Sequence, residues 1–314
     1  MDEKKSSKTD EILRQLEDGV LNLFESDTYK RYLDTMSKFH SYSVNNCILI
    51  SQQKPDSTYV AGYHKWIELN RHVMAGEKGI TIIAPAPYKK TVEVNVTDDK
   101  GVQIRDSDGN PITDKQEITV YSFRTATVFD ISQTQGEPLP DLISELKDPV
   151  DRYDDLLQII TDLCPVPVKF DNIDSGANGY YSPVNQEIVI KRGMPEEQSL
   201  KTLVHECAHA RLGHGGKDDH SDRRTHEVQA ESVAYCVCKA IGLDTSDYSF
   251  GYIAGYSSGK DQKELKASLQ IIRDVSDKMI TEFQVRWSLL MDSRAQVTSI
   301  DDPGIKPHGC GMAM

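Results

Sequence analysis

Several features that define other classes of protein are missing from this sequence. No run of eighteen apolar residues is present, so no segment has the length of a membrane-spanning helix. The N-terminal stretch MDEKKSSKTDEILRQ contains no apolar core of the kind that signal peptides have. The six cysteines are scattered and form no pair of CxxC motifs, so neither a cysteine zinc knuckle nor a disulfide framework is indicated. We therefore expect a cytoplasmic protein without a membrane partner.

The length and composition indicate two folded domains. The chain has 314 residues, of which 38% are hydrophobic and 27% charged, which gives enough apolar material for cores in more than one ordinary domain. Glycine, proline and acidic residues concentrate in QTQGEPLPDLISELKDP, residues 133–149, where we place the domain boundary. We predict an α+β protein with an α+β domain over 1–140, a mainly helical domain with a small edge sheet over 148–290, and a flexible tail over 291–314.

Hydrophobic periodicity predicts where the helices and strands lie. We expect a helix over 12–24 and a second helix that begins at Asp27 or Thr28, keeps its apolar stripe to Ile48 and stops before Pro55. Residues 91–130 alternate in polarity around turn-rich segments, which indicates β-hairpin structure with an acidic tip. Further helices are predicted at 151–164, 195–213, 222–241, 250–258 and 262–290.

The motif that indicates chemistry is LVHECAH at residues 203–209, a complete HExxH. On a helix, His205 and His209 lie one turn apart on the same face, about 6 Å from each other, so both imidazoles can reach one ion. Glu206 then points toward the open coordination position. The sequence therefore predicts a Zn²⁺ site in which His205 and His209 are ligands and Glu206 is the general base.

A catalytic zinc needs a third protein ligand, and the sequence offers two carboxylates for it. The HExxHxxGxxH pattern of metzincins fails because Leu212 stands at its glycine position. Downstream, Glu227 and Glu231 share one helical face, and a glutamate on a second helix is the gluzincin solution. We favour Glu227 as the ligand and Glu231 as the residue that orients an imidazole, with the reverse assignment left open. His214, His220 and His226 lie in a polar, glycine-rich region and are expected to be solvated.

This ligand set predicts peptide hydrolysis, with a peptide or protein as the possible substrate. Zinc lowers the pKa of a bound water and polarises a carbonyl, and Glu206 would take the proton and later donate it to the leaving amine. Tyr252 and Tyr256 are candidates for help at the oxyanion, although nothing in the sequence selects them over ordinary packing. The strand Glu187–Ile190 is a candidate edge to which an extended peptide could add.

The net charge of −13 argues against nucleic-acid binding, but the charge is unevenly distributed. Residues 28–90 hold nine Lys and Arg against four acids, a net of +5, together with eight aromatic residues. Single strands bind to positive grooves in which bases stack on aromatic side chains. The candidates for such contacts are Tyr63, Lys65, Trp66, Arg71 and Lys78. A tryptophan in a short helix is, however, more often a core residue than a stacking platform.

Several separated motifs resemble one known family in their order. AGYHKWIELNRHVMAGEKGITIIAPAP followed by VFDISQTQGEPLP resembles the N-terminal single-stranded-DNA-binding domain of ArdC-type antirestriction proteins. The second half, with HExxH and the later EVQAE at 227–231, is similar to the zincin-like metallopeptidase domain of that family. This chain departs from the family by Cys207 in HECAH and by a long acidic hairpin insertion around 96–116. The resemblance implies a protein of conjugative or integrative elements that coats entering single-stranded DNA and protects it from restriction.

Three hypotheses follow. The first is a single-stranded-DNA-binding antirestriction protein that carries a zinc metallopeptidase-like domain. The second is a zinc protease that cleaves a DNA-bound regulator or a host defence protein, with the N-terminal domain used for targeting. The third is a non-enzymatic DNA-binding protein in which zinc only stabilises the fold.

Overall fold

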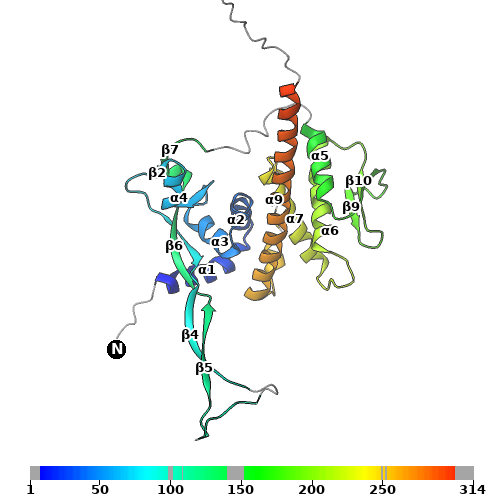
Figure 1. Cartoon of the computed structure of the whole chain (residues 1–314). Coiled ribbons are helices and arrows are strands. Elements are labelled where there is room, and N and C mark those ends of the chain that lie inside the picture. Colours follow the sequence, from blue (N-terminus) through cyan, green and yellow to red (C-terminus); the bar gives the residue numbers. More distant parts are fainter. Residues whose placement is uncertain are drawn as a thin grey trace, which may run out of the picture. The chain divides into compact units, whose positions relative to one another are not determined.

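The computed structural model describes residues 8–97, 102–107, 109–139, 152–248, 250–251 and 253–300. It divides into two compact units (Figure 1). The first unit comprises the chain up to Gly19 together with Asn45–Pro138, and the second comprises Val20–Val44 and the chain from Leu139 onward. The chain combines helices and sheets in two units, so the predicted α+β class is confirmed. None of the helices in the described part has the length and apolar character that a bilayer crossing requires.

The first unit is built on a three-stranded antiparallel sheet in the order β1-β6-β3, to which a two-stranded sheet of β2 and β7 and a ribbon of β4 and β5 are added. The predicted hairpin over 91–130 is thereby confirmed. The bounds are α1 Lys8–Leu23, α3 Val44–Gln53, β1 Val60–Gly62, α4 Tyr63–Glu68, β2 Arg71–Val73, β3 Ile80–Pro85, β4 Tyr88–Asn95, β5 Thr113–Val120, β6 Phe123–Asp130, the 3-10 turn η1 Ile131–Gln133, and β7 Thr134–Gly136.

Two side-chain amides on α3 cover the outer edge of β3. Asn46 accepts from the backbone N–H of Ile83 and donates to its carbonyl, both at 2.9 Å. Gln53 makes the same pair of hydrogen bonds with Thr81, at 2.9 and 2.8 Å. These amides occupy the backbone groups that an additional strand would use, so this sheet edge is protected from pairing with another chain.

The second unit is mainly helical and contains one small sheet. Its strands lie in the order β8-β10-β9, with β10 parallel to β8 and antiparallel to β9. The strand Glu187–Ile190, predicted as an edge, is therefore the central strand, and that prediction is wrong. The bounds are α2 Ser26–Lys38, α5 Arg152–Leu163, β8 Val168–Asp171, β9 Gly179–Ser182, β10 Glu187–Lys191, α6 Glu196–Leu212, α7 Arg223–Ala240, α8 Ile253–Ser257 and α9 Gln262–Ile300.

The single helix predicted from residue 27 to Ile48 is instead two helices, because the chain turns between α2 and α3. The guanidinium of Arg273 on α9 donates to the carbonyls of His40, Ser41 and Tyr42 at 2.9–3.0 Å. Asp277, one turn further along α9, contacts His40 Nδ1 at 2.7 Å. The turn is stable because α9 supplies the donors that its carbonyls would otherwise lack.

Residues 20–44 pack within the second unit, whereas the predicted domain limits of 1–140 and 148–290 assign them to the first. On α2, the Tyr29 hydroxyl pairs with Ser232 Oγ at 2.8 Å, and Asp34 accepts from the Tyr235 hydroxyl at 2.7 Å. The aromatic stripe of α2 is thus core of the helical unit. At the other end, α9 continues through Ile300, beyond the start of the predicted tail, and 301–314 lie outside the described residues.

Candidate metal centre

Helices α6 and α7 hold the side chains of the predicted metal site and pack against each other. On α6, Leu203, Val204 and Cys207 are buried, which fixes the rotation of the helix and turns the two motif histidines to the opposite side. Asp222 caps α7 by accepting from the backbone N–H of Thr225 at 2.8 Å. The buried face of α6 and the N-cap of α7 therefore fix the two helix segments that hold the site.

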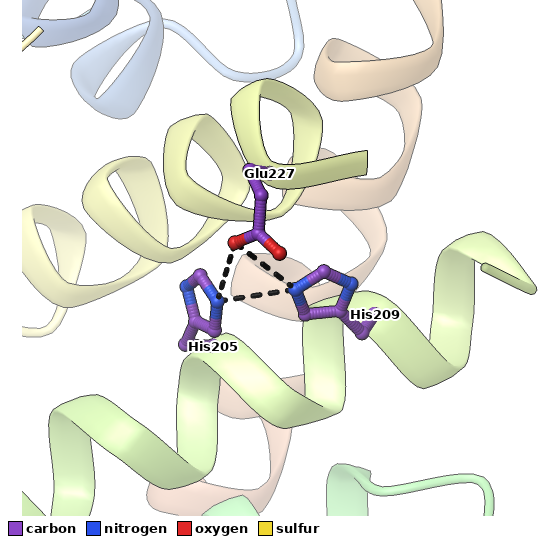
Figure 2. A group of neighbouring side chains, drawn as sticks. All are labelled: His205, His209 and Glu227. Atoms are coloured by element: carbon purple, nitrogen blue, oxygen red, sulfur yellow. Dashed lines mark hydrogen bonds and ion pairs between the residues drawn. The ribbon is translucent and has the colours of Figure 1, made fainter. Parts of the chain in front are cut away.

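His205, His209 and Glu227 converge on one point (Figure 2). The two Nε2 atoms lie 3.1 Å apart, and Glu227 Oε2 lies 3.7 Å from Nε2 of His205 and 3.9 Å from Nε2 of His209. The point equidistant from three atoms at these separations is about 2.1 Å from each, within the ~2.0–2.2 Å that Zn²⁺ keeps from imidazole nitrogen and carboxylate oxygen. The donor set and its spacing fit a divalent cation.

Glu231 contacts the same histidine from its other side. Its Oε2 lies 3.1 Å from His205 Nδ1, while Glu227 faces Nε2. Burial alone would lower the pKa of His205, but the hydrogen bond to Glu231 and the nearby carboxylates of Glu206 and Glu227 raise it. The two glutamates that the sequence left as alternatives thus occupy different positions, one beside each ring nitrogen of His205.

A chain of hydrogen bonds supports the second histidine. His209 Nδ1 lies 2.8 Å from His214 Nδ1, and His214 Nε2 lies 3.1 Å from Gln229 Oε1. Gln229 then donates to Ser268 Oγ at 3.1 Å. Because the amide oxygen can only accept, His214 carries its proton on Nε2 and accepts through Nδ1, so His209 donates through Nδ1 and leaves Nε2 free.

His209 and His214, the two histidines of this hydrogen-bond chain, are held neutral. Burial, followed by the charge of His205, lowers the pKa of His209 to about 3. Burial also lowers the pKa of His214 to about 4, although the hydrogen bond that it donates to Gln229 acts in the opposite direction. A neutral imidazole is the form that binds a metal.

The position of His214 differs from the sequence prediction of a solvated side chain, since it is only 5% exposed. Helix α6 ends at Leu212 and is capped by Gly213, which has φ of 72°. The backbone N–H groups of Gly213 and His214 bond back to Ala210 and His209 at 3.2 and 3.1 Å, a Schellman motif. The glycine directly before His214 is the sequence signal that could have placed this histidine beneath His209.

Glu206 lines the cleft at the site and is 9% exposed. Burial raises the pKa of its carboxyl. Two adjoining cavities of about 260 and 470 Å³ share Gly179, His205 and Glu206 in their walls, and strand β9 runs beside both. A Cβ at Gly179 would lie 2.7 Å from Thr202 Cγ2 on α6, so β9 can approach α6 this closely only with glycine at this position.

Of the two predicted oxyanion candidates, Tyr256 does not reach this cleft. Tyr256 is buried and donates its hydroxyl to Ser268 Oγ at 2.8 Å, behind the hydrogen-bond chain of His214, and it lines neither cavity. Tyr252 lies outside the described residues. Tyr180 and Tyr181 on β9 line the larger cavity instead.

The structure separates the predicted nucleic-acid contacts into two groups. Trp66 is fully buried and donates its indole N–H to the carbonyl of Phe129 at 3.0 Å. Arg71 is also buried, and its guanidinium donates to Thr134 and to the carbonyls of Gly136 and Glu137. Neither can present a face or a charge to DNA in this fold, so we correct both to structural residues. Tyr63, Lys65 and Lys78 are exposed, with Lys65 paired to Glu68 at 3.0 Å.

Comparisons with known proteins match the N-terminal and C-terminal parts of the chain separately. Residues 3–129 match the family model of the N-terminal domain of anti-restriction factor ArdC. Residues 166–238, which include His205, Glu206, His209 and Glu227, match a peptidase family described as the IrrE N-terminal-like domain. Two family models thus match the chain in sequence order, an ArdC N-terminal domain followed by an IrrE-like domain. The family resemblance predicted from the sequence motifs is therefore confirmed.

Individual relatives of this chain are distant. An uncharacterized protein of Bacillus anthracis is 26% identical over 93% of this chain, which spans 55% of that protein's length. Crystal structures of the antirestriction ArdC protein from the R388 plasmid cover 78% of this chain. The metal-free structure is 21% identical with a TM-score of 0.44 over 85% of that chain, and the Mn(II)-bound structure is 20% identical with a TM-score of 0.43 over 84%.

Proposed function

We propose that the helical unit is a zinc-dependent peptidase of gluzincin type. The observation that carries the proposal is the triangle of His205, His209 and Glu227, whose spacing suits a Zn²⁺ ion. When bound, the metal would supply an acidified water and a Lewis acid for a carbonyl. Glu231 orients His205, and His214 orients His209, each through the Nδ1 that the metal does not use.

Glu206 moves the proton in this proposal. Its partial burial, which raises the pKa of the carboxyl above the usual value, makes it both an acceptor from the attacking water and a later donor to the leaving amine. An extended peptide would lie along β9, because β9 is an edge of its sheet and its residues line the cleft at Glu206.

We further propose that the whole chain acts in the cytoplasm as an antirestriction protein of a mobile element, with the first unit binding single-stranded DNA. Support comes from the match of residues 3–129 to the ArdC N-terminal domain and from the basic, aromatic window over 28–90. A protease aimed at a DNA-bound regulator or host defence protein is the second candidate function, since the complete HExxH argues for catalysis.

One pair of variants tests catalysis against a purely stabilising metal. Glu206→Gln leaves every proposed ligand in place, so we expect zinc content and the thermal midpoint to stay at the wild-type level while cleavage of β-casein is lost. His205→Ala should lose both the metal and the cleavage. Two results together would favour the non-enzymatic hypothesis. Wild-type protein would bind one zinc but cleave no β-casein, and Glu206→Gln would have the wild-type phenotype in vivo.

A further inference from the structure

The larger of the two cavities beside Glu206 is bounded by three segments of the second unit. Tyr180 and Pro183 line it from β9 and the turn that follows, Glu206 lines it from α6, and Arg223 lines it from the start of α7. Its volume of about 470 Å³ lies within the ~300–1,000 Å³ of ordinary ligand pockets. A side chain of a peptide bound in the cleft therefore has room to enter it.

The loop between α6 and α7 forms one wall of this cavity and is held by polar contacts. Asp219 accepts from the backbone N–H of Gly215 at 2.7 Å and lies 2.6 Å from Nε2 of His226 on α7. Gly215 also lies close to the turn after β9, since a Cβ at this position would be 3.2 Å from Pro183 Cγ. This wall is thus formed without a ligand, so a ligand does not have to order it.

Arg223 is the single arginine or lysine among the described residues that line this cavity. It begins α7 one turn before Glu227, yet its side chain makes no ion pair or hydrogen bond with the described part of the chain. The neighbouring Arg224 differs, because its guanidinium donates to the carbonyl of Gly255 at 3.0 Å. Arg223 therefore brings a positive charge and a fork of N–H donors to the cleft without an acceptor among the described residues.

The smaller cavity also contains a cation, but that cation is already paired. Lys201 lies one turn before His205 on α6, and its ammonium is 3.0 Å from Asp247. Glu231 lines the same cavity. A negatively charged group of a substrate would meet two carboxylates there, so within the described part of the cleft Arg223 is the cation that remains for it.

We propose that Arg223 selects substrates by binding a peptide carboxylate, either the side chain of an aspartate or glutamate near the scissile bond or the C-terminal carboxylate. This inference rests on the peptidase function proposed for the second unit and names its substrate class. A guanidinium binds a carboxylate through two parallel hydrogen bonds. A peptide that lies along β9 would pass Arg223, because Tyr180 and Tyr181 of β9 line the same cavity.

The first test is the cleavage-site profile of the zinc-loaded, full-length protein on a library of chymotryptic peptides, with the sites identified by mass spectrometry. We expect Asp and Glu to be enriched at one position near the scissile bond, or cleavage to occur at a fixed distance from the C-terminus. Arg223→Ala should remove this preference, and Arg223→Glu should replace it by a preference for Lys and Arg. Arg224→Ala is the matched control and should keep the wild-type profile.

Internally quenched peptides that differ only at the preferred position, with Glu or Gln, give the size of the effect. We expect kcat/KM for the Glu peptide to exceed that for the Gln peptide by roughly 10- to 100-fold, as for one charge-assisted contact. In Arg223→Ala the two values should become equal, while kcat/KM for the Gln peptide stays at the wild-type level. The same peptides with free and amidated C-termini distinguish the two sources of the carboxylate, because amidation removes only the terminal one.

Peptide binding without turnover gives a readout that does not depend on catalysis. Fluorescently labelled versions of these peptides are titrated with Glu206→Gln, which keeps every proposed metal ligand, and with Glu206→Gln/Arg223→Ala. Anisotropy should show that the peptide with the preferred carboxylate binds Glu206→Gln roughly 10- to 100-fold more tightly than its uncharged counterpart. The double variant should bind both peptides equally.

The outcomes separate this inference from the function on which it rests. Wild-type protein that cleaves none of the peptides contradicts the peptidase function, and binding to Glu206→Gln then still tests Arg223. Cleavage without any preference for a carboxylate overturns the inference alone, as does a preference that persists in Arg223→Ala. Equal binding of charged and uncharged peptides to Glu206→Gln would likewise overturn it and leave Arg223 a solvated surface residue.

Discussion

At the scale of single residues, the metal centre depends on which nitrogen each histidine offers. Glu231 beside Nδ1 of His205 and His214 beside Nδ1 of His209 leave both Nε2 atoms directed at Glu227. The HExxH spacing alone predicted His205, Glu206 and His209. It could not separate Glu227 from Glu231, because the two lie on one face of α7 and only the approach of α6 distinguishes them.

His214 provides a prediction at this scale. His214→Ala removes the acceptor for His209 Nδ1, so we expect zinc affinity to fall by about 10- to 100-fold, as for other partners of ligand histidines. Competition with a chromogenic chelator measures this directly. His220→Ala, an exposed histidine of the following loop, is the control and should keep wild-type affinity. Equal affinities in all three proteins would show that His214 does not orient the ligand.

Residue-level reasoning failed where exposure depends on the rest of the fold. Trp66 and Arg71 have the types expected of DNA contacts, yet the sheet formed with residues 123–136 buries both. Phe123 is apolar and stands in a strand that alternates, so its pattern predicts burial, but it lies beyond the end of the packed part of β6 and is exposed. Local sequence patterns do not show which part of a strand is covered.

At the scale of elements, periodicity predicted α5, α6, α7 and α8 to within a few residues, since each has a buried stripe, whereas α9 starts as predicted but runs to Ile300 rather than to 290. It failed between α2 and α3, where the apolar stripe continues through a turn. The three carbonyls of that turn are satisfied by Arg273, more than 230 positions further along the chain. No local signal predicts a donor supplied from so far away in sequence.

Arg273 therefore carries a stability prediction. Arg273→Ala leaves the carbonyls of residues 40–42 without their donor, and we expect a loss of about 2 kcal/mol in the free energy of unfolding. Arg273→Lys should retain only part of this stabilisation, because an ammonium cannot match the planar fork of a guanidinium. Urea denaturation followed by circular dichroism measures the change, with the exposed Lys263→Ala as control. Similar stabilities for Arg273→Ala and the control would contradict this role.

At the scale of the whole molecule, the two proposed activities belong to different units. The metal ligands lie on α6 and α7 of the second unit, whereas single-stranded-DNA binding is proposed for the first. The net charge of −13 does not reveal this division. The window over residues 28–90, with its net charge of +5, indicates it only coarsely, because residues 28–44 pack in the helical unit.

This division predicts that metal and nucleic acid bind independently. Stripping the metal with a chelator should leave oligonucleotide affinity within about twofold, because no ligand of the metal belongs to the unit for which DNA binding is proposed. Fluorescence anisotropy of a labelled oligo-dT, measured with apo and with zinc-loaded protein, reports the coupling. A tenfold or larger change on metal removal would show that the two sites are coupled and that the second unit contributes to nucleic-acid binding.

The most direct measurement is the metal content of the purified protein and of four variants, determined by elemental mass spectrometry after equilibration with Zn²⁺. We predict one zinc per wild-type chain, loss of binding in His205→Ala, His209→Ala and Glu227→Ala, and weakened but stoichiometric binding in Glu231→Gln. Full occupancy in Glu227→Ala together with loss in Glu231→Gln, or no zinc in folded wild-type protein, would contradict the claim that His205, His209 and Glu227 hold the ion.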